Sequence, residues 1–275
     1  MRTFPWIAVL LGAAAFGGTA VEIEECPSPI PVPRLEKPVV IDGDLSEWRD
    51  FAYTDGVWDI ERLRQCPWFD PERNRLTNHG ERCHPTQDLM SRYFIAWDET
   101  FLYLGAEVHD NANDAEDPEH EPKRWYYKDS VSWFMEAPRD QENERFGEGD
   151  HAFSFVIDPA KPSYGAWWRH GSGEESYIEE PLPPESVAYE IKMNPWGKGP
   201  GDYVLEARVN MEGTFGRGDP SWAFPREGHV YSLAIVHCDP DGGGYGGHLI
   251  LYGTGDDDNT WRPCVLRGPM RAPGP

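Results

Sequence analysis

The feature that most constrains the fold is the alternation of apolar and polar residues in short segments that are separated by turns. Residues 102–108 show the pattern, and it recurs in the segments 131–135, 153–157, 203–209 and 230–236. Alternation places the apolar side chains on one face of an extended strand, while little in the chain repeats at helical spacing. Gly, Pro and Asp between the segments supply turns. The sequence therefore predicts an all-β fold, an antiparallel β-sandwich of two sheets of jelly-roll or immunoglobulin-like type, with long loop insertions.

The first twenty residues have the pattern of a secretory signal peptide. Met1-Arg2 is a short positive region, residues 5–18 are apolar, and Gly18-Thr19-Ala20 is a small-residue cleavage site. The apolar run is short for a membrane span, and the sequence holds no second candidate. We therefore expect cleavage after residue 20, a secreted or periplasmic location, and no membrane span in the mature chain. An uncleaved anchor is the alternative.

The remaining chain is long enough for one large β domain. Residues 21–37 are rich in Pro and are expected to form a linker; residues 38–268 are expected to form the sandwich, and 269–275 a tail. Two long irregular segments interrupt the strands. Residues 55–90 hold a Cys-flanked insert with a short helix, and residues 159–200 are expected to be a surface excursion.

The charge is strongly acidic, with 48 Asp and Glu against 25 Lys and Arg, or −23. Such a surface repels nucleic acid and anionic lipid, so we expect neither as a partner. It is compatible with neutral sugars and with divalent cations. A solvated acidic surface also explains it without any ligand.

Five cysteines in an exported chain favour disulfides. Cys66 and Cys83 flank the first insert and are expected to pair. Cys238 and Cys264 lie near the ends of the last strands and form a second expected pair, which leaves Cys26 over. Spacing alone leaves the connectivity open.

The stretch Ile41-Asp42-Gly43-Asp44-Leu45-Ser46-Glu47-Trp48 follows an apolar strand and carries three carboxylates. Gly43 can take the backbone angles of a sharp turn. The Asp side chains can cap that turn or bind a hard cation.

Five segments, taken in order, resemble the family 9 carbohydrate-binding modules, part of a wider DOMON-like group of sandwiches that includes haem-binding members. They are Val39 to Trp48, Ala96 to Leu104, the pair Val108-His109-Asp110 and Asp129-Ser130-Val131, Tyr203 to Ala207, and Asp258 to Pro263. The resemblance covers most of residues 38–268. It implies a β-sandwich that binds carbohydrate without catalysis.

In that family a sugar lies between two aromatic side chains. The resemblance places one at Trp261, with Asp258 and Asn259 as polar neighbours, and the other at Tyr126 or the adjacent Trp125. A pyranose presents C–H bonds to an aromatic plane, while its hydroxyls need convergent donors and acceptors. The chain departs from the family at two polar positions, with Ser132 where a Glu is expected and Ser154 where an Arg is expected. The fold is thus implied more firmly than the binding mode.

The family also uses calcium as a structural ion. The residues that the resemblance offers as ligands are Asp42, Asp44, Glu47, Asp110 and Asp129. Calcium takes six to eight oxygens, which clustered carboxylates and loop carbonyls can supply. The alternative is that Asp42 and Asp44 only cap the turn.

Two other functions stay open on the sequence. A glycan-active enzyme would need two carboxylates across one bond, for instance Glu136 and Glu206. A haem-binding electron-transfer module would need an axial ligand such as Met135 or Met193. Trp167-Trp168 could also offer an aromatic platform, and since adjacent strand residues face opposite ways, only one of the two rings could line it.

Overall fold

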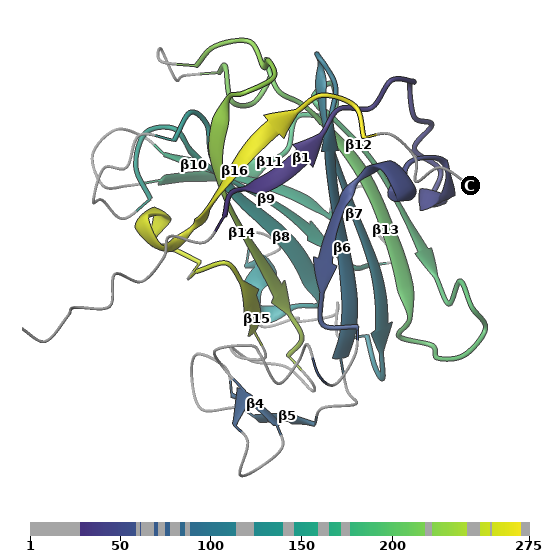
Figure 1. The fold of residues 1–275 in the computed structure, drawn as a ribbon. Helices are drawn as coiled ribbons and strands as arrows, with labels where there is room; N and C mark the ends of the chain where they lie inside the picture. Colours follow the sequence, from purple (N-terminus) through teal and green to yellow (C-terminus); the bar gives the residue numbers. More distant parts are fainter. Residues whose placement is uncertain are drawn as a thin grey trace, which may run out of the picture.

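The computed structural model describes residues 28–58, 61, 89–113, 124–139, 146–158, 165–171, 177–217, 222–240, 248–253 and 255–270, and the backbone of 69–70, 75–77 and 83–85. The chain forms two large sheets that face each other, as Figure 1 shows. The predicted all-β sandwich is confirmed. No helix among the described residues is long and apolar enough to cross a membrane.

The larger sheet has eight strands, in the order β1-β16-β14-β8-β9-β10-β11, with β15 also paired to β14. Its neighbours are antiparallel except for the parallel pair β1 and β16. Its strands are β1 (Ile30–Pro33), β8 (Ser130–Glu136), β9 (Asp150–Val156), β10 (Ala166–Gly171), β11 (Tyr177–Pro181), β14 (Val230–Cys238), β15 (His248–Leu251) and β16 (Arg262–Arg267).

The smaller sheet is antiparallel, in the order β12-β13-β7-β6-β2. Its strands are β2 (Tyr53–Gly56), β6 (Leu89–Trp97), β7 (Phe101–Asp110), β12 (Val187–Met193) and β13 (Tyr203–Asn210). A third, small sheet contains β3 (Phe69–Asp70), β4 (Arg75–Thr77) and β5 (Cys83–Pro85). Short 3-10 helices lie at η1 (Leu45–Glu47), η2 (Arg49–Phe51), η3 (Trp125–Tyr127) and η5 (Asp258–Thr260).

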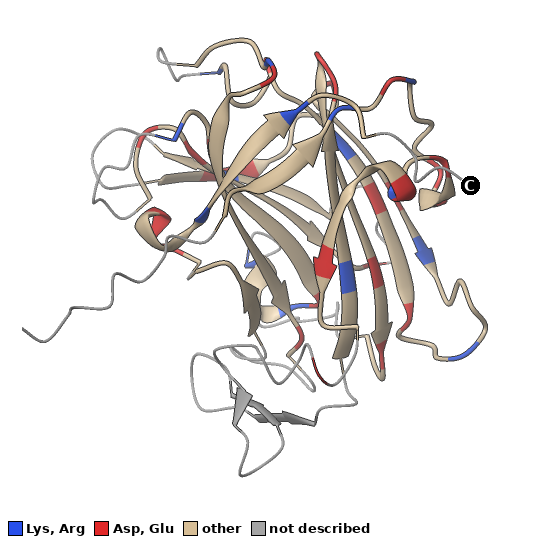
Figure 2. Cartoon of the chain, in the orientation of Figure 1, with Lys and Arg blue, Asp and Glu red and all other residues tan. Residues whose placement is uncertain are grey.

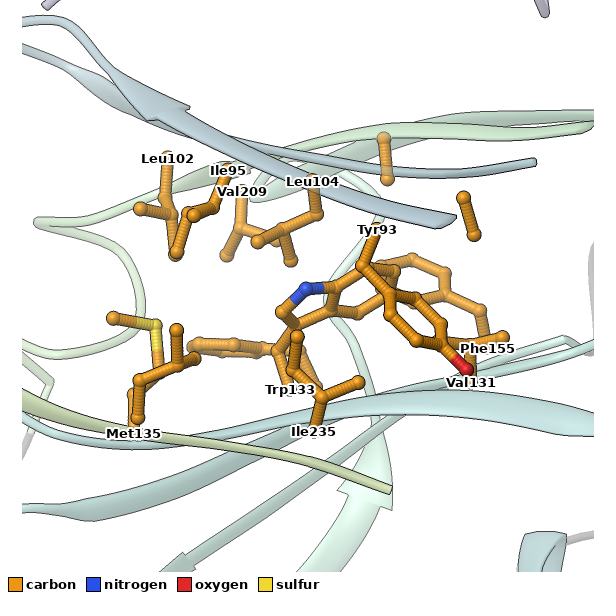
Figure 3. Packing of buried hydrophobic residues seen from close by; sticks show 14 of the residues in the cluster. Tyr93, Ile95, Leu102, Leu104, Val131, Trp133, Met135, Phe155, Val209 and Ile235 are labelled. Atoms are coloured by element: carbon orange, nitrogen blue, oxygen red, sulfur yellow. The ribbon is translucent and has the colours of Figure 1, made fainter. Parts of the chain in front are cut away.

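The main core lies between the two large sheets (Figure 3). Trp133 and Phe155 from the larger sheet meet Tyr93 and Leu104 from the smaller one, and all four are at most 1% exposed. Because successive strand residues face opposite ways, the residues between them point to the outer faces of the sandwich. Met135, the haem-ligand candidate, is a packing residue of this core.

The hairpin between β6 and β7 is closed by Asp98, which the sequence places in a turn. Its Oδ1 accepts the backbone N–H of Thr100 at 2.7 Å and of Phe101 at 2.6 Å. Its Oδ2 accepts the hydroxyl of Tyr103 at 2.7 Å. One carboxylate therefore supplies the partners that a tight turn leaves open.

Two of the predicted boundaries differ from the structure. Residues 30–33, inside the expected linker, form β1, whose Ile30 and Val32 are fully buried against β16. The segment 159–200 contains β10, β11 and β12, the outermost strands on one side of both sheets. The prediction of a surface excursion there is wrong. In β12, alternate residues (Val187, Tyr189, Ile191 and Met193) pack against the main core, although no residue of this strand is fully buried.

The predicted disulfide between Cys238 and Cys264 is wrong, because both thiols are free and buried. Cys264 on β16 lies opposite Tyr231 on β14. Cys238 is seven residues further along β14, which is a distance of roughly 23 Å from Tyr231 in an extended strand. The two thiols also point to opposite faces of the sheet. A disulfide needs Cα atoms within about 7 Å. Cys26 and Cys66 lie outside the described residues, so the Cys66–Cys83 pair and the short helix in that insert stay predictions.

Figure 2 shows Asp and Glu spread over loops and along the smaller sheet, interspersed with Lys and Arg.

Candidate functional site

The predicted sugar-binding aromatics come together on the outer face of the larger sheet. Trp125 and Trp261 belong to one buried cluster there, and Tyr126 packs against it. We call this cluster the aromatic face; its other members are Phe134, Phe146, Ala152, Val156, Trp167, Ala234, Val236, Cys238 and Ile250. Residues from η3, β8, β9, β10, β14, β15 and the end of η5 thus share one surface.

The centre of the aromatic face is Phe134 on β8. Its ring centroid lies 6.1 Å from that of Trp125, 5.7 Å from that of Trp261 and 6.3 Å from that of Phe146, each with an edge-to-face arrangement. Phe146 also lies 6.1 Å from Trp261. Trp261 is 1% exposed and Trp125 3% exposed. The ring of Trp261 is covered by its neighbours, Phe134 and Phe146 among them, so no ligand can stack on it in this arrangement.

Phe146 is held in place by a backbone contact. Gly171 at the end of β10 approaches the turn after Phe146 so closely that a Cβ on it would meet the carbonyl oxygen of Gly147 at 1.6 Å. The N–H of Gly147 donates to Oδ2 of Asp150 at 2.5 Å. Glycine at 171 is therefore a steric requirement of this arrangement.

The polar neighbours of Trp261 lie in η5. Asp258 is buried, and its Oδ1 accepts the backbone N–H of Asn259 at 2.8 Å. Asn259 is exposed, and its side-chain nitrogen donates to Asp257 at 3.2 Å and to Asp258 at 3.3 Å. These groups shape the turn that leads to Trp261.

An arginine from β10 contributes the charge of the aromatic face. Arg169 is 5% exposed; its guanidinium lies 5.5 Å from the ring centre of Trp125 and 4.2 Å from that of Tyr177. It donates to Glu179 at 3.2 Å and to Asp256 at 2.9 Å. Glu179 also accepts the indole N–H of Trp125 at 2.8 Å.

The two serines that stand where the resemblance implies a Glu and an Arg bond to each other. Oγ of Ser132 donates to Oγ of Ser154 at 2.7 Å, and both residues are buried. Trp167 lies directly opposite Ser154 on the next strand. The serine pair is neutral, so the charged groups of this face come from β10 and β11 instead.

Three buried carboxylates form a second site. Asp110 at the end of β7, Asp129 just before β8 and Asp239 just after β14 have carboxylate oxygens within 4.8 Å of one another. We call them the carboxylate cluster. The pairing of Ser130 with Cys238 brings the two larger-sheet residues to the same end, and β7 supplies the third from the opposite sheet. Carboxylates so close disfavour a charged state unless a cation balances them.

Tyrosine and histidine side chains hold the interior next to the carboxylate cluster. The buried imidazole of His237 is hydrogen-bonded to the hydroxyl of Tyr93 at 2.7 Å and to that of Tyr203 at 2.9 Å. Burial raises the pKa of Tyr203 well above its usual value, and the nearby Asp110 and Asp129 raise it further. This network ties both sheets together where the carboxylates meet.

The other three predicted calcium ligands lie apart, in the opening turn. Asp42 Oδ1 accepts the N–H of Asp44 at 3.0 Å, Asp44 Oδ1 accepts that of Ser46 at 2.9 Å, and Glu47 Oε2 accepts that of Val40 at 3.3 Å. The backbone and side chain of Ser46 lower the pKa of Asp44. The structure thus brings Asp110 and Asp129 together and leaves the opening-turn carboxylates to cap their own loop.

The carboxylates of Glu136 and Glu206 lie on opposite outer faces of the sandwich. Glu136 accepts the hydroxyl of Ser232 on the larger sheet at 2.5 Å, whereas Glu206 accepts the indole of Trp48 beyond the smaller one. They cannot act across one glycosidic bond, which needs carboxyl groups about 5–9.5 Å apart.

Sequence reasoning missed the residues that complete both sites. Arg169 follows Trp167 and Trp168 in the sequence without a pattern of its own, and the opposite orientation of the two tryptophans is confirmed. Glu179 and Tyr177 carry no sequence signal. Asp239 does follow directly on an apolar strand, as Asp110 ends one, and that shared position is the signal that could have found it.

Comparisons with protein families and with solved structures found proteins that are similar to this chain. A family profile described as "Carbohydrate family 9 binding domain-like" matches residues 67–269. No curated protein sequence matches the chain.

Solved structures give the same fold. Two are structures of a carbohydrate-binding module of family 9 from Caldicellulosiruptor kristjanssonii, both 14% identical with a TM-score of 0.54. The cellotriose complex covers 87% of this chain and 94% of its own; the glucose complex covers 89% and 100%. A structure from Bacteroides uniformis is 9% identical, with a TM-score of 0.54, and covers 87% of this chain and 100% of its own. At these identities the likeness shows the fold.

Proposed function

The chain belongs to the carbohydrate family 9 binding domain-like family, and we propose that it binds a carbohydrate on its aromatic face without catalysing a reaction. The observation that carries the proposal is the convergence of Trp125, Tyr126 and Trp261 on one outer sheet face, although Trp125 and Trp261 are 136 positions apart in the sequence. The buried rings form a rigid base on the sheet, and an aromatic ring exposed above that base offers the flat apolar surface that the C–H face of a pyranose needs.

The accessible aromatic rings are those of tyrosines. Tyr177 is 48% exposed and lies against the guanidinium of Arg169, while Tyr126 is half-buried and lies against the ring of Trp125. A sugar that rests on these two rings meets the buried aromatics below and the polar groups of β10 and β11 at its edge. We take Tyr126 and Tyr177 as the outer contacts, with Trp125 orienting Tyr126 and with Arg169 and Phe146 orienting Tyr177.

The ligand class follows from the relatives. The solved family 9 structures hold glucose and cellotriose, so we propose a neutral β-glucan or its end unit for this chain. A surface of charge −23 favours a neutral ligand over an acidic one.

Calorimetric titration with glucose and cellotriose tests the proposal. Tyr126→Ala and Tyr177→Ala are expected to weaken binding about tenfold or more, since each removes a stacking ring from a solvent-facing position. Phe224→Ala is the matched control, because Phe224 is 63% exposed away from this cluster. Absence of binding to both sugars by the wild type would contradict the proposal. Release of reducing ends from cello-oligosaccharides would show an enzyme instead.

We also propose that calcium occupies the carboxylate cluster. Asp110, Asp129 and Asp239 supply hard oxygen ligands, and the charge that they concentrate in a buried place is the charge that a divalent cation balances. Calcium there would join the end of β7 to the loops beside β8 and β14, and so stabilise the sandwich.

Export is the third part of the proposal and rests on residues 1–20, which lie outside the described residues. Sequencing of the mature N-terminus from the culture medium or periplasm is expected to begin at Val21. An N-terminus that retains these residues in the cell fraction would contradict export.

A further inference from the structure

Two buried N–H groups on strand β10 point to a ligand that supplies oxygen atoms. Within the described part of the chain, Nε of Arg169 and Nε1 of Trp167 make no hydrogen bond. Arg169 is 5% exposed and Trp167 9% exposed. A buried donor without an acceptor costs free energy, so it marks a place where an acceptor is expected.

Both donors belong to the aromatic face. Trp167 and Arg169 are two positions apart on β10, and therefore lie on the same side of the sheet. Trp167 is a member of the aromatic face, and the guanidinium of Arg169 lies among the rings of Trp125, Phe146 and Tyr177. A sugar on this face would bring hydroxyl oxygens to the edge where the donors lie.

The charges around Arg169 decide which sugar fits. Its other nitrogens already bond to Glu179 and Asp256. One guanidinium between two carboxylates gives the site a formal charge of about −1. A neutral hydroxyl can accept from the remaining N–H, whereas the carboxylate of an acidic sugar would face two like charges.

We propose that Arg169 and Trp167 orient the ligand by donating to its hydroxyl oxygens, and that the flanking Glu179 and Asp256 restrict the ligand to neutral sugars. The inference rests on the proposed function and specifies it: the two positions supply the polar contacts that Ser132 and Ser154 do not. Arg169 and Trp167 are thus specificity-determining residues.

Conservative variants test the two donors. Arg169→Lys keeps a positive charge but removes the Nε–H, and Trp167→Phe keeps a ring but removes the indole N–H. Each is expected to weaken cellotriose binding roughly tenfold. Trp222→Phe is the matched control, since the Nε1 of Trp222 is also buried without a hydrogen bond but lies against the main core. The control is expected to bind like the wild type, and melting curves check that every variant is folded.

Glucuronic acid against glucose tests the charge argument. The wild type is expected to bind glucuronic acid at least about tenfold more weakly than glucose. The double variant Glu179→Gln with Asp256→Asn keeps side-chain acceptors for Arg169 while removing both charges, and is expected to bring the two affinities within about threefold.

The outcomes separate the inference from the proposed function. Cellotriose binding that is lost in Tyr177→Ala but unchanged in Arg169→Lys and Trp167→Phe would overturn the inference and leave the function standing. Equal wild-type affinities for glucose and glucuronic acid would overturn the restriction to neutral sugars. A wild type that binds no saccharide overturns both.

Discussion

The indole N–H of Trp48 donates to Oε1 of Glu206 at 2.8 Å, across the outer face of the smaller sheet. The other carboxylate oxygen accepts the backbone N–H of Asp42 and of Gly43, both at 2.8 Å. Gly43 takes a φ of 79°, which lets the turn present these two donors together. Two sequence segments that carry the family resemblance, the opening motif and the late central strand, are therefore physical partners.

Trp48→Phe tests this contact. A smaller aromatic ring remains while the N–H is lost, so one oxygen of Glu206 loses its donor in a buried place. We expect a loss of about 1–3 kcal/mol in the free energy of unfolding, measured by urea denaturation.

Glu190→Gln is the control for that variant. Glu190 lies opposite Glu206 on β12 and is exposed, so its change is expected to stay within about 0.5 kcal/mol. If Trp48→Phe and Glu190→Gln cost the same, the indole hydrogen bond does not contribute to stability.

The sandwich could be predicted because its alternation is local. Residues 102–108 and 203–209 show their core face within single strands, and both faces are where the pattern predicts them. The sequence of β14 does not show which of its faces points into the main core, because both faces are buried. Ala234 and Val236 belong to the aromatic face, and Leu233 and Ile235 belong to the main core. Alternation carries no information about the inner face when both faces are apolar.

The gathering of Trp125, Tyr126 and Trp261 could be expected from the family resemblance, but their burial could not. Phe146 covers Trp261 through a turn whose position depends on Gly171, a contact between strands with no sequence pattern of its own. The same holds for Arg169, which reaches Trp125 only because β10 pairs with β9. Non-local pairing decides these contacts.

Phe146→Ala is expected to uncover Trp261. The substitution removes the ring that packs on Trp261 and should let a sugar stack there, so cellotriose binding tightens while the protein loses up to about 3–5 kcal/mol of stability. Acrylamide quenching of tryptophan fluorescence should rise. Weaker binding without increased quenching would show that Phe146 itself supports the ligand.

His151 makes the stability of the protein depend on pH. Burial, and then the nearby His170, lowers the pKa of His151 from 6.5 to about 3. In the unfolded chain His151 therefore binds a proton below pH 6.5, whereas in the folded chain it stays neutral down to about pH 3. The stabilisation is fully present above pH 6.5 and is lost as the pH falls, by about 2 kcal/mol at pH 5.

His151→Phe is the variant that isolates this effect. Phenylalanine cannot titrate, so denaturation curves at pH 7.5 and pH 5 should show a loss smaller than that of the wild type by about 2 kcal/mol. The variant also removes the acceptor of the indole N–H of Trp168 at 3.1 Å, which lowers stability at both pH values alike. Equal pH dependence in the two proteins would contradict a neutral, buried His151.

Removal of calcium is expected to lower the melting temperature, because an ion that binds only the folded chain stabilises it by about 2.7 kcal/mol at a hundredfold excess over Kd. Asp239→Asn should weaken calcium binding, measured by calorimetric titration, and abolish the shift on adding a chelator, since Asp239 is one of the three converging carboxylates.

Asp44→Asn is the matched control: Asn also caps a 3-10 helix, so the opening turn stays intact. Loss of the calcium response in Asp44→Asn but not in Asp239→Asn would move the site to the opening turn. A wild type whose melting ignores both calcium and chelator would contradict the ion altogether.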